Sequence, residues 1–158
     1  MDVNPNARVL RFRPSNSSFS NIISQRVELV RRFPLFSEIP LEDCSKIVAP
    51  AQERHFLRGK TIFFQGDPVR QVLFLTSGCI KVSQLGPNGQ EVILRLIGPG
   101  ESVSAESCAN CTAHCSTART MEPSTALVWE SKTFEAVAAR FPVLLRNIWC
   151  DLQRQIRP

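Results

Sequence analysis

The sequence predicts a mainly β domain, an antiparallel β-roll of the double-stranded jelly-roll kind, with flanking helices and a C-terminal helix. Three observations predict it. All seven glycines lie between residues 59 and 100, an interval that also holds the β-branched and aromatic runs TIFF, QVLFL, CIKVSQL and EVILRLI. Turn signals such as LRGK, QGDP and GPNGQ separate these runs, and short strands at such spacing indicate an antiparallel roll or sandwich. A helical period returns after Ser131 and predicts the closing helix.

A single domain is predicted over residues 21–158, preceded by a disordered leader over residues 1–20. The leader is polar and rich in Pro, Asn and Ser, whereas apolar residues recur at helical spacing from Asn21 and predict a short helix over residues 21–32. A second short helix is predicted in LEDCSKIV, which has two acidic residues in its first turn. The Asn-Gly pair in LGPNGQ predicts the tip of a β-hairpin.

Composition and charge exclude several classes of protein. The 158 residues carry 19 Lys and Arg against 14 Asp and Glu, a net charge of +5, and the excess lies in residues 1–32 and 140–158. Charge at the two ends favours a solubilising tail and a solvated helix face over a DNA-reading surface. No apolar run reaches the about 20 residues of a membrane helix, and no secretory signal is found. We therefore expect a cytoplasmic protein whose six cysteines are reduced.

The last predicted helix, over residues 142–155, carries a wide apolar stripe. Leu145, Ile148 and Leu152 belong to it and recur at i, i+3 and i+7. The stripe is wider than a helix with one buried face requires. It can therefore pack on the roll or pair with a second copy of the helix. We expect a homodimer through these three residues.

The order of helix, glycine-punctuated roll and long helix resembles the cyclic-nucleotide-binding-like sensory domain of the Crp-Fnr family of transcription regulators. FPLFSEIPLEDCSKI is similar to the helices that open such domains. LRGKTIFFQGDPVRQVLFLTSGCIKVSQ is similar to their central strands, with turn positions of the family at Gly59, Gly66, Asp67 and Gly78. The stretches SGCIKVS and FPVLLRN favour this family over kinases and channels.

The resemblance covers about residues 20–155 and implies a sensory unit that normally drives a helix-turn-helix DNA reader. No helix-turn-helix pattern is found in residues 21–158. DNA is therefore expected as a partner only through a domain that these residues do not contain.

The resemblance also indicates where a cyclic nucleotide would bind. Relatives that bind cyclic AMP carry Gly-Glu and, after a short helix, Arg-Ser/Thr-Ala, in which the Glu holds the ribose and the Arg holds the phosphate. Here the Gly-Glu falls on Ser104 and Ala105, and the Arg falls on Ser116. A buried phosphate without a cation is costly, so a cyclic nucleotide is the less favoured ligand. An effector pocket is predicted around the nearest replacements, Glu106, Ser116, Thr117 and Arg119.

The stretch SCANCTAHCST places Cys108, Cys111 and Cys115 within eight residues, with His114 beside the last. Thiolates at this spacing can surround one metal ion, and they suit an iron–sulfur cluster or zinc. Three alternatives stay open: a metal or cluster site, a thiol redox switch, and a plain structural loop. Oxygen-sensing relatives hold their cluster mostly through leader cysteines, which this leader lacks. Small buried residues are predicted at the other cysteines, Cys44, Cys79 and Cys150.

Catalysis is not predicted. Cys115 and His114 are adjacent, so in a strand their side chains point to opposite faces, and no paired carboxylates, phosphate-binding glycine loop or nucleophile elbow is found. The sequence instead predicts a sensory domain that reads an effector, redox or metal state and biases a two-state dimer through its last helix. The alternatives are a plain dimerisation or structural module and a small-molecule-binding domain.

Overall fold

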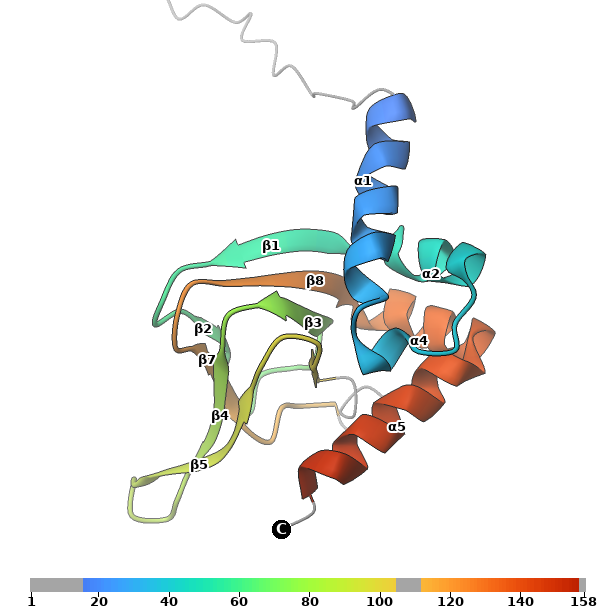
Figure 1. The fold of residues 1–158 in the computed structure, drawn as a ribbon. Helices are drawn as coiled ribbons and strands as arrows, with labels where there is room; N and C mark the ends of the chain where they lie inside the picture. The colour runs from blue at the N-terminus through green and yellow to red at the C-terminus, as the bar shows by residue number, and fades with distance from the viewer. Residues whose placement is uncertain (1–15, 105–111, 157–158) are drawn as a thin grey trace, which may run out of the picture.

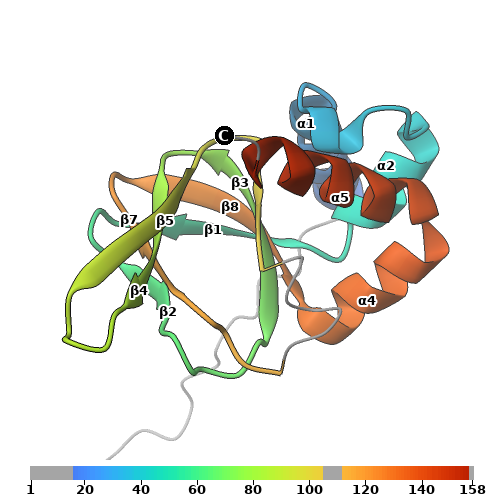
Figure 2. The same cartoon turned by 90° about the horizontal axis from the view of Figure 1, so that it is seen from below.

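The computed structural model of the chain describes residues 16–104 and 112–156. Two β-sheets form a roll, the helices gather on one side of it, and the β4–β5 hairpin projects from the opposite side (Figures 1 and 2). The elements in chain order are α1 (Asn16–Val30), η1 (Pro34–Phe36), α2 (Leu41–Val48), β1 (Gln52–Phe56), β2 (Thr61–Phe63), β3 (Gln71–Ser77), β4 (Ile80–Leu85), β5 (Glu91–Ile97), β6 (Ser102–Val103), β7 (Thr117–Thr120), β8 (Ser124–Glu130), α4 (Ser131–Arg140) and α5 (Pro142–Ile156).

The two four-stranded sheets have the orders β1-β8-β3-β6 and β2-β7-β4-β5. Neighbouring strands pair antiparallel, so the predicted antiparallel roll is confirmed. The predicted hairpin joins β4 to β5, and the Gly86 amide donates to the Gln90 carbonyl at 2.8 Å across its turn. The analysis of the sequence missed β1, β6 and β7, because QERHF and TART are polar and β6 is two residues long.

The roll has one apolar core inside it and a second between its β1-β8-β3-β6 sheet and the helices. The inner core includes Leu73, Leu75 and Ile80. The outer core joins Val72 and Phe74 of β3 to side chains of all four α-helices. Phe74 makes edge-to-face contacts with Phe33 and Phe36, with ring centroids 5.5 and 5.2 Å apart, an arrangement that aromatic quadrupoles favour.

Two buried polar side chains fix the helices to the rest of the domain. Trp129 of β8 donates from Nε1 to the Ile47 carbonyl of α2 at 2.8 Å. Asn147 of α5 donates from Nδ2 to the Leu35 and Ser37 carbonyls at 2.9 and 2.8 Å. Such bonds satisfy carbonyl groups that would otherwise be buried without a partner. None of the helices in the described part of the chain is both long and apolar enough to cross a bilayer.

Two predictions about the helices need correction. α1 begins at Asn16 and ends at Val30, so residues 16–20, which the predicted leader included, belong to the helix. The buried Cys44 agrees with its prediction and Cys79 is half-buried, but Cys150 is exposed. Cys150 lies on a face of α5 that the core does not cover, and helical spacing of the apolar residues alone did not reveal which face that was.

Gly78 is required by its surroundings as well as by its backbone. Its φ is +98°, a conformation that only glycine adopts cheaply. A Cβ at this position would lie 2.6 Å from the Ser124 backbone Cα. Gly89, at the β4–β5 turn, shares the positive φ of +78° but faces open space.

We expect Gly78→Ala to destabilise the fold by clearly more than Gly89→Ala. The second change carries only the left-handed backbone cost of about 1–2 kcal/mol, whereas the first also forces the β3–β4 turn away from β8. Chemical denaturation of both variants measures the difference. Equal losses of unfolding free energy would show that the contact with Ser124 relaxes at no cost.

Candidate functional site

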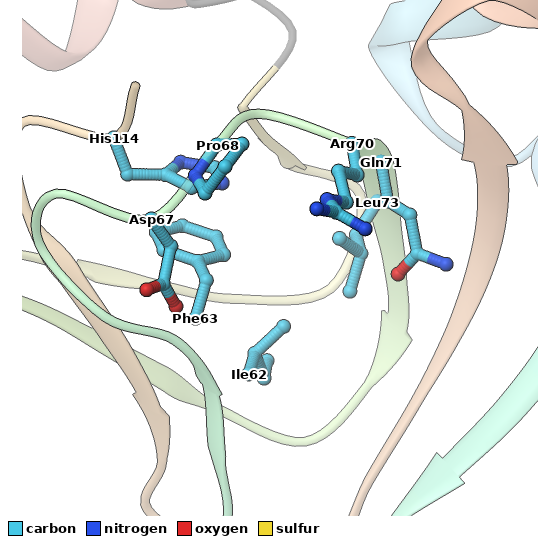
Figure 3. A pocket seen from close by; sticks show the side chains of 8 residues that line it. All are labelled: Ile62, Phe63, Asp67, Pro68, Arg70, Gln71, Leu73 and His114. Atoms are coloured by element: carbon cyan, nitrogen blue, oxygen red, sulfur yellow. The ribbon is translucent and has the colours of Figure 1, made fainter. Parts of the chain in front are cut away.

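A cavity of about 440 Å³ opens at the edge of the roll, next to the connection between β2 and β3. Figure 3 shows the side chains that line it. They come from β2, from the turn that follows it, from the start of β3 and from the segment before β7: Ile62, Phe63, Asp67, Pro68, Arg70, Gln71, Leu73 and His114. This volume lies in the range of small-molecule sites.

The turn between β2 and β3 forms one rim of the cavity. Gly66 has a φ of +93°, and Asp67 accepts a hydrogen bond at Oδ2 from the Phe64 amide at 2.9 Å, which closes the turn. Both residues occupy turn positions that the sequence predicted. The turn thereby directs Phe63 and Arg70 to the same cavity.

The segment Thr112–His114 is held against this turn by its backbone. The Val69 amide donates to the Thr112 carbonyl at 3.0 Å, the His114 amide donates to the Asp67 carbonyl at 2.8 Å, and the Gly66 amide donates to the His114 carbonyl at 2.7 Å. Pro68 and Ala113 form an isolated β-bridge. The end of the cysteine-rich stretch is thus part of the cavity rim.

The His114 ring is buried and lies flat on the Phe63 ring, with centroids 3.5 Å apart and an angle of 6° between the planes. Burial lowers the pKa of His114 below its ordinary value of 6.5, and the negative charge of Asp67 opposes this only in part. The imidazole is therefore neutral around pH 7 and forms an aromatic wall rather than a charged one.

Arg70 carries the positive charge of the cavity. Its guanidinium points toward the space between Phe63 and Leu73 (Figure 3). The oxygen-bearing side chains of the lining are engaged elsewhere: Asp67 closes its turn, and Gln71 accepts from Arg54 at 3.3 Å.

The structure separates the residues of the predicted effector pocket. Glu106 lies outside the described residues. Thr117 accepts the Gln65 amide at 2.9 Å and is held at the β2–β7 seam. Arg119 is exposed and donates from Nε to the Gly59 carbonyl at 2.9 Å, because Ala118 takes the inward position of β7. Neither Thr117, Arg119 nor the half-buried Ser116 lines the cavity.

Ser104, where the family alignment expects glycine, has a φ of +71°. This left-handed backbone supports the alignment, since glycine is the residue that favours it. The Ser104 hydroxyl is buried and has no hydrogen-bond partner among the described residues.

The predicted cysteine site falls mostly outside the described residues, which exclude Cys108 and Cys111. Cys115 is an exposed free thiol, and its carbonyl accepts the Gln84 Nε2 group at 2.7 Å. His114 has its ring against Phe63. Within residues 16–104 and 112–156, no group of three His, Cys, Asp or Glu side chains is placed to hold a metal ion.

The dimer-helix residues also differ in their surroundings. Ile148 is 2% exposed and belongs to the chain's own core, and Leu152 packs against that core. Leu145 is 38% exposed and Trp149 is 46% exposed. The free apolar face of α5 therefore comprises Leu145 and Trp149 rather than Ile148.

β5 carries further exposed apolar residues. Burial raises the pKa of Asp151 on α5, and the charges of Arg154 and of Arg95 on β5 partly offset the rise, so the Arg95 side chain of β5 reaches toward α5. The exposed apolar side chains of β5 are Val92, Ile93, Leu94 and Leu96. We call these four residues, together with Leu145 and Trp149, the α5–β5 surface.

Sequence reasoning missed the cavity residues Phe63, Arg70 and Gln71. A signal was present in TIFFQGDPVRQ, where an aromatic strand end and an arginine flank a tight turn. Their convergence with His114, however, depends on backbone pairing across more than 40 residues of chain, as Val69 to Thr112 shows.

Comparisons with known proteins agree with this architecture. The model of the cyclic nucleotide-binding domain family matches residues 53–141. The cyclic AMP receptor protein of Thermus thermophilus is 28% identical over 124 residues, which are 78% of this chain and 57% of that protein. The crystal structure of the Thermus thermophilus catabolite activator protein has a TM-score of 0.70 at 28% identity, covering 78% of this chain and 58% of that one.

The sensor domain of the transcriptional regulator DNR from Pseudomonas aeruginosa has the same fold, with a TM-score of 0.71 at 22% identity over 86% of this chain and 91% of that one. The roll, its helices and the cavity define a cyclic-nucleotide-binding-like β-roll domain. The chain belongs to the cyclic nucleotide-binding domain family, and its resemblance to Crp-Fnr regulators is confirmed. It spans about 57% of the length of the cyclic AMP receptor protein it matches.

The stability of the domain should fall with acidification below about pH 6.5 in part because of His114. Its pKa is lowered in the folded state, so the unfolded chain takes up the proton first. The stability that neutral His114 contributes is fully present above the pKa of this residue in the unfolded chain. It is lost as pH falls through the lower pKa of His114 in the folded protein. Thermal unfolding of the wild type and His114→Gln between about pH 7 and 5 should show a smaller loss in the variant. The exposed His55→Gln serves as the control, and identical slopes for wild type and His114→Gln would contradict the assignment.

Proposed function

We propose that this chain is the effector-sensing domain of a Crp-Fnr type transcription regulator, which binds a small molecule in the cavity and signals through α5. The observation that carries the proposal is the alternation of β3. Gln71 and Leu73 face the cavity, whereas Val72 and Phe74 pack in the core that contains Leu144 and Ile148 of α5. Side chains alternate between the two faces of a strand, so a ligand that moves one set of residues moves the other.

The proposed effector is not a cyclic nucleotide. The relative from Thermus thermophilus is named a cyclic AMP receptor protein, but the two positions that would bind ribose and phosphate carry no charge here. The phosphate position is Ser116, and the nearest arginine, Arg119, is bonded to Gly59 outside the cavity. A phosphate bound there would lose water without gaining a cation.

The proposed signalling unit is a homodimer through the α5–β5 surface. Its side chains are apolar yet exposed on α5 and on β5, and exposed apolar residues that gather on one face are typical of interaction sites. Ile148 supports the helix from the core side, and it therefore does not contact the second copy directly. The alternative of a plain dimerisation module would keep this surface and make the cavity irrelevant.

We expect Trp149→Glu to convert the dimer to a monomer that stays folded, because a charge would be buried at the contact. Leu57→Glu is the matched control, since Leu57 is 80% exposed on the β1–β2 turn. Ile148→Glu should instead unfold the domain. Sedimentation velocity and circular dichroism separate these outcomes, and a wild-type monomer at high concentration would overturn the dimer.

The cysteine-rich stretch is proposed as a second input to the cavity. Cys108, Cys111 and Cys115 have a spacing that suits zinc or an iron–sulfur cluster, and the segment Thr112–His114 between them is hydrogen-bonded to the cavity rim. Metal loss or thiol oxidation could therefore act on the rim. His114 is stacked on Phe63 by the face of its ring, which leaves the in-plane nitrogen lone pairs open, so His114 stays a candidate fourth ligand beside the thiols.

Metal analysis and the visible spectrum of anaerobically purified protein test this input. We expect iron with visible absorption or stoichiometric zinc, and its loss in Cys115→Ser. Cys79→Ser is the control, because Cys79 is half-buried just before β4 and lies outside the cysteine-rich stretch of the sequence. A colourless, metal-free wild type would contradict the metal site and leave a thiol switch or a plain loop.

The proposal makes the domain a non-enzymatic, cytoplasmic regulator. Its named relatives here are a cyclic AMP receptor protein and transcriptional regulators. DNA would be contacted through a helix-turn-helix reader following the dimer helix, and the domain would control the orientation of two such readers.

A further inference from the structure

We infer that the cavity binds a small aromatic or cyclic monocarboxylate, with its carboxylate on Arg70 and its ring against the Phe63 wall. This inference rests on the proposed function, because it names the ligand class of the proposed effector site. The charge of the cavity, its apolar wall and the position of its carboxylate each point to this ligand class.

The first feature is the unpaired guanidinium of Arg70. Among the lining side chains Arg70 is the permanent cation, and no ion pair or side-chain hydrogen bond joins it to another residue of the described chain. A guanidinium presents parallel N–H donors that match the two oxygens of a carboxylate. Its direction into the cavity (Figure 3) makes an anion the complementary group.

The second feature is the apolar wall. Phe63 is covered on one face by His114 at a centroid distance of 3.5 Å and borders the cavity together with Ile62 and Leu73. A flat apolar body gains from burial against such a surface.

The third feature is Asp67, which lies on the Phe63 side of the cavity across from Arg70 (Figure 3). Its carboxylate accepts the Phe64 amide within the β2–β3 turn, which holds a negative charge at this rim. A ligand with a second negative group would bring that group toward Asp67 without a partner, and like charges repel. The cavity therefore selects one negative charge and disfavours dicarboxylates.

Calorimetric titration of the 158-residue chain with phenylacetate, phenylacetamide and 1,4-phenylenediacetate tests the inference. Phenylacetate should bind saturably at one site per chain. Phenylacetamide, which keeps the shape without the charge, and 1,4-phenylenediacetate, which adds a second carboxylate at the far end of the ring, should each bind at least about tenfold more weakly.

Arg70→Gln supplies the matched variant, since the exposed Arg70 side chain has no partner in the described structure whose loss would unfold the domain. It should weaken phenylacetate at least about tenfold and leave phenylacetamide unchanged. Arg58→Gln, on the exposed β1–β2 turn, should change neither. Thermal unfolding checks that both variants are folded.

No saturable phenylacetate binding, equal affinity for the acid and the amide, or indifference to Arg70→Gln would each overturn the inference. Saturable binding of cyclic AMP that ignores Arg70→Gln would also overturn it while leaving an effector-sensing domain in place. Phenylacetate binding that depends on Arg70 but leaves the balance between the two states of the dimer unchanged would uphold the ligand class and overturn the proposed signalling function.

Discussion

The two-sided packing of β3 is the constraint on which the rest of the domain depends. Leu73 and Leu75 fill the inside of the roll, whereas Val72 and Phe74 face the helices, and all four side chains are at most 2% exposed. Each such side chain contributes about 1.5–3 kcal/mol through burial. One strand therefore belongs to both cores, and neither the roll nor the helical layer can shift alone.

This arrangement explains why a cavity at the edge of the roll can matter to a helix outside it. The cavity begins at Gln71 and Leu73, one residue away from side chains that pack with α4 and α5. Phe33, which makes an edge contact with Phe74, also approaches Gly100 so closely that a Cβ there would lie 2.5 Å from the ring. The start of β3, the β5–β6 turn and the segment after α1 are thus in direct contact, and protein interiors packed this tightly transmit displacement.

The charge pattern of the cavity distinguishes this chain from a cyclic-nucleotide receptor of the same fold. The phosphate position of the family alignment carries Ser116, and Arg119 is committed to the Gly59 carbonyl on the outside of β7. A different cation, Arg70, points into the cavity from the side across from Asp67. In the proposed function the fold is kept while the recognition groups change place, as is common where one scaffold serves several ligands.

Local patterns in the sequence predict the roll, its turns and the order of the helices. Positive-φ glycines at residues 59, 66, 78 and 89, strong strand formers between them and the helical period after Ser131 are local signals, and local backbone preferences act without the rest of the chain. The cysteine-rich stretch and the uncharged Ser116 at the family's phosphate position are also evident from the sequence. The polar strands β1 and β7 were not predicted, because their position depends on pairing with distant strands. β1 pairs with β8, and β7 pairs with β2 and β4.

Which side chains form a site depends on long-range packing and strand register, which become visible in the folded structure. The stripe of α5 contains Ile148 and Trp149 in adjacent positions, and whether each faces the core or solvent follows from where α5 docks on η1 and the roll. Arg119 and Arg70 look equivalent in sequence, yet the register of β7 directs one outward and the β2–β3 turn directs the other into the cavity. Burial and direction are properties of long-range pairing, so no pattern within a short window of sequence contains them.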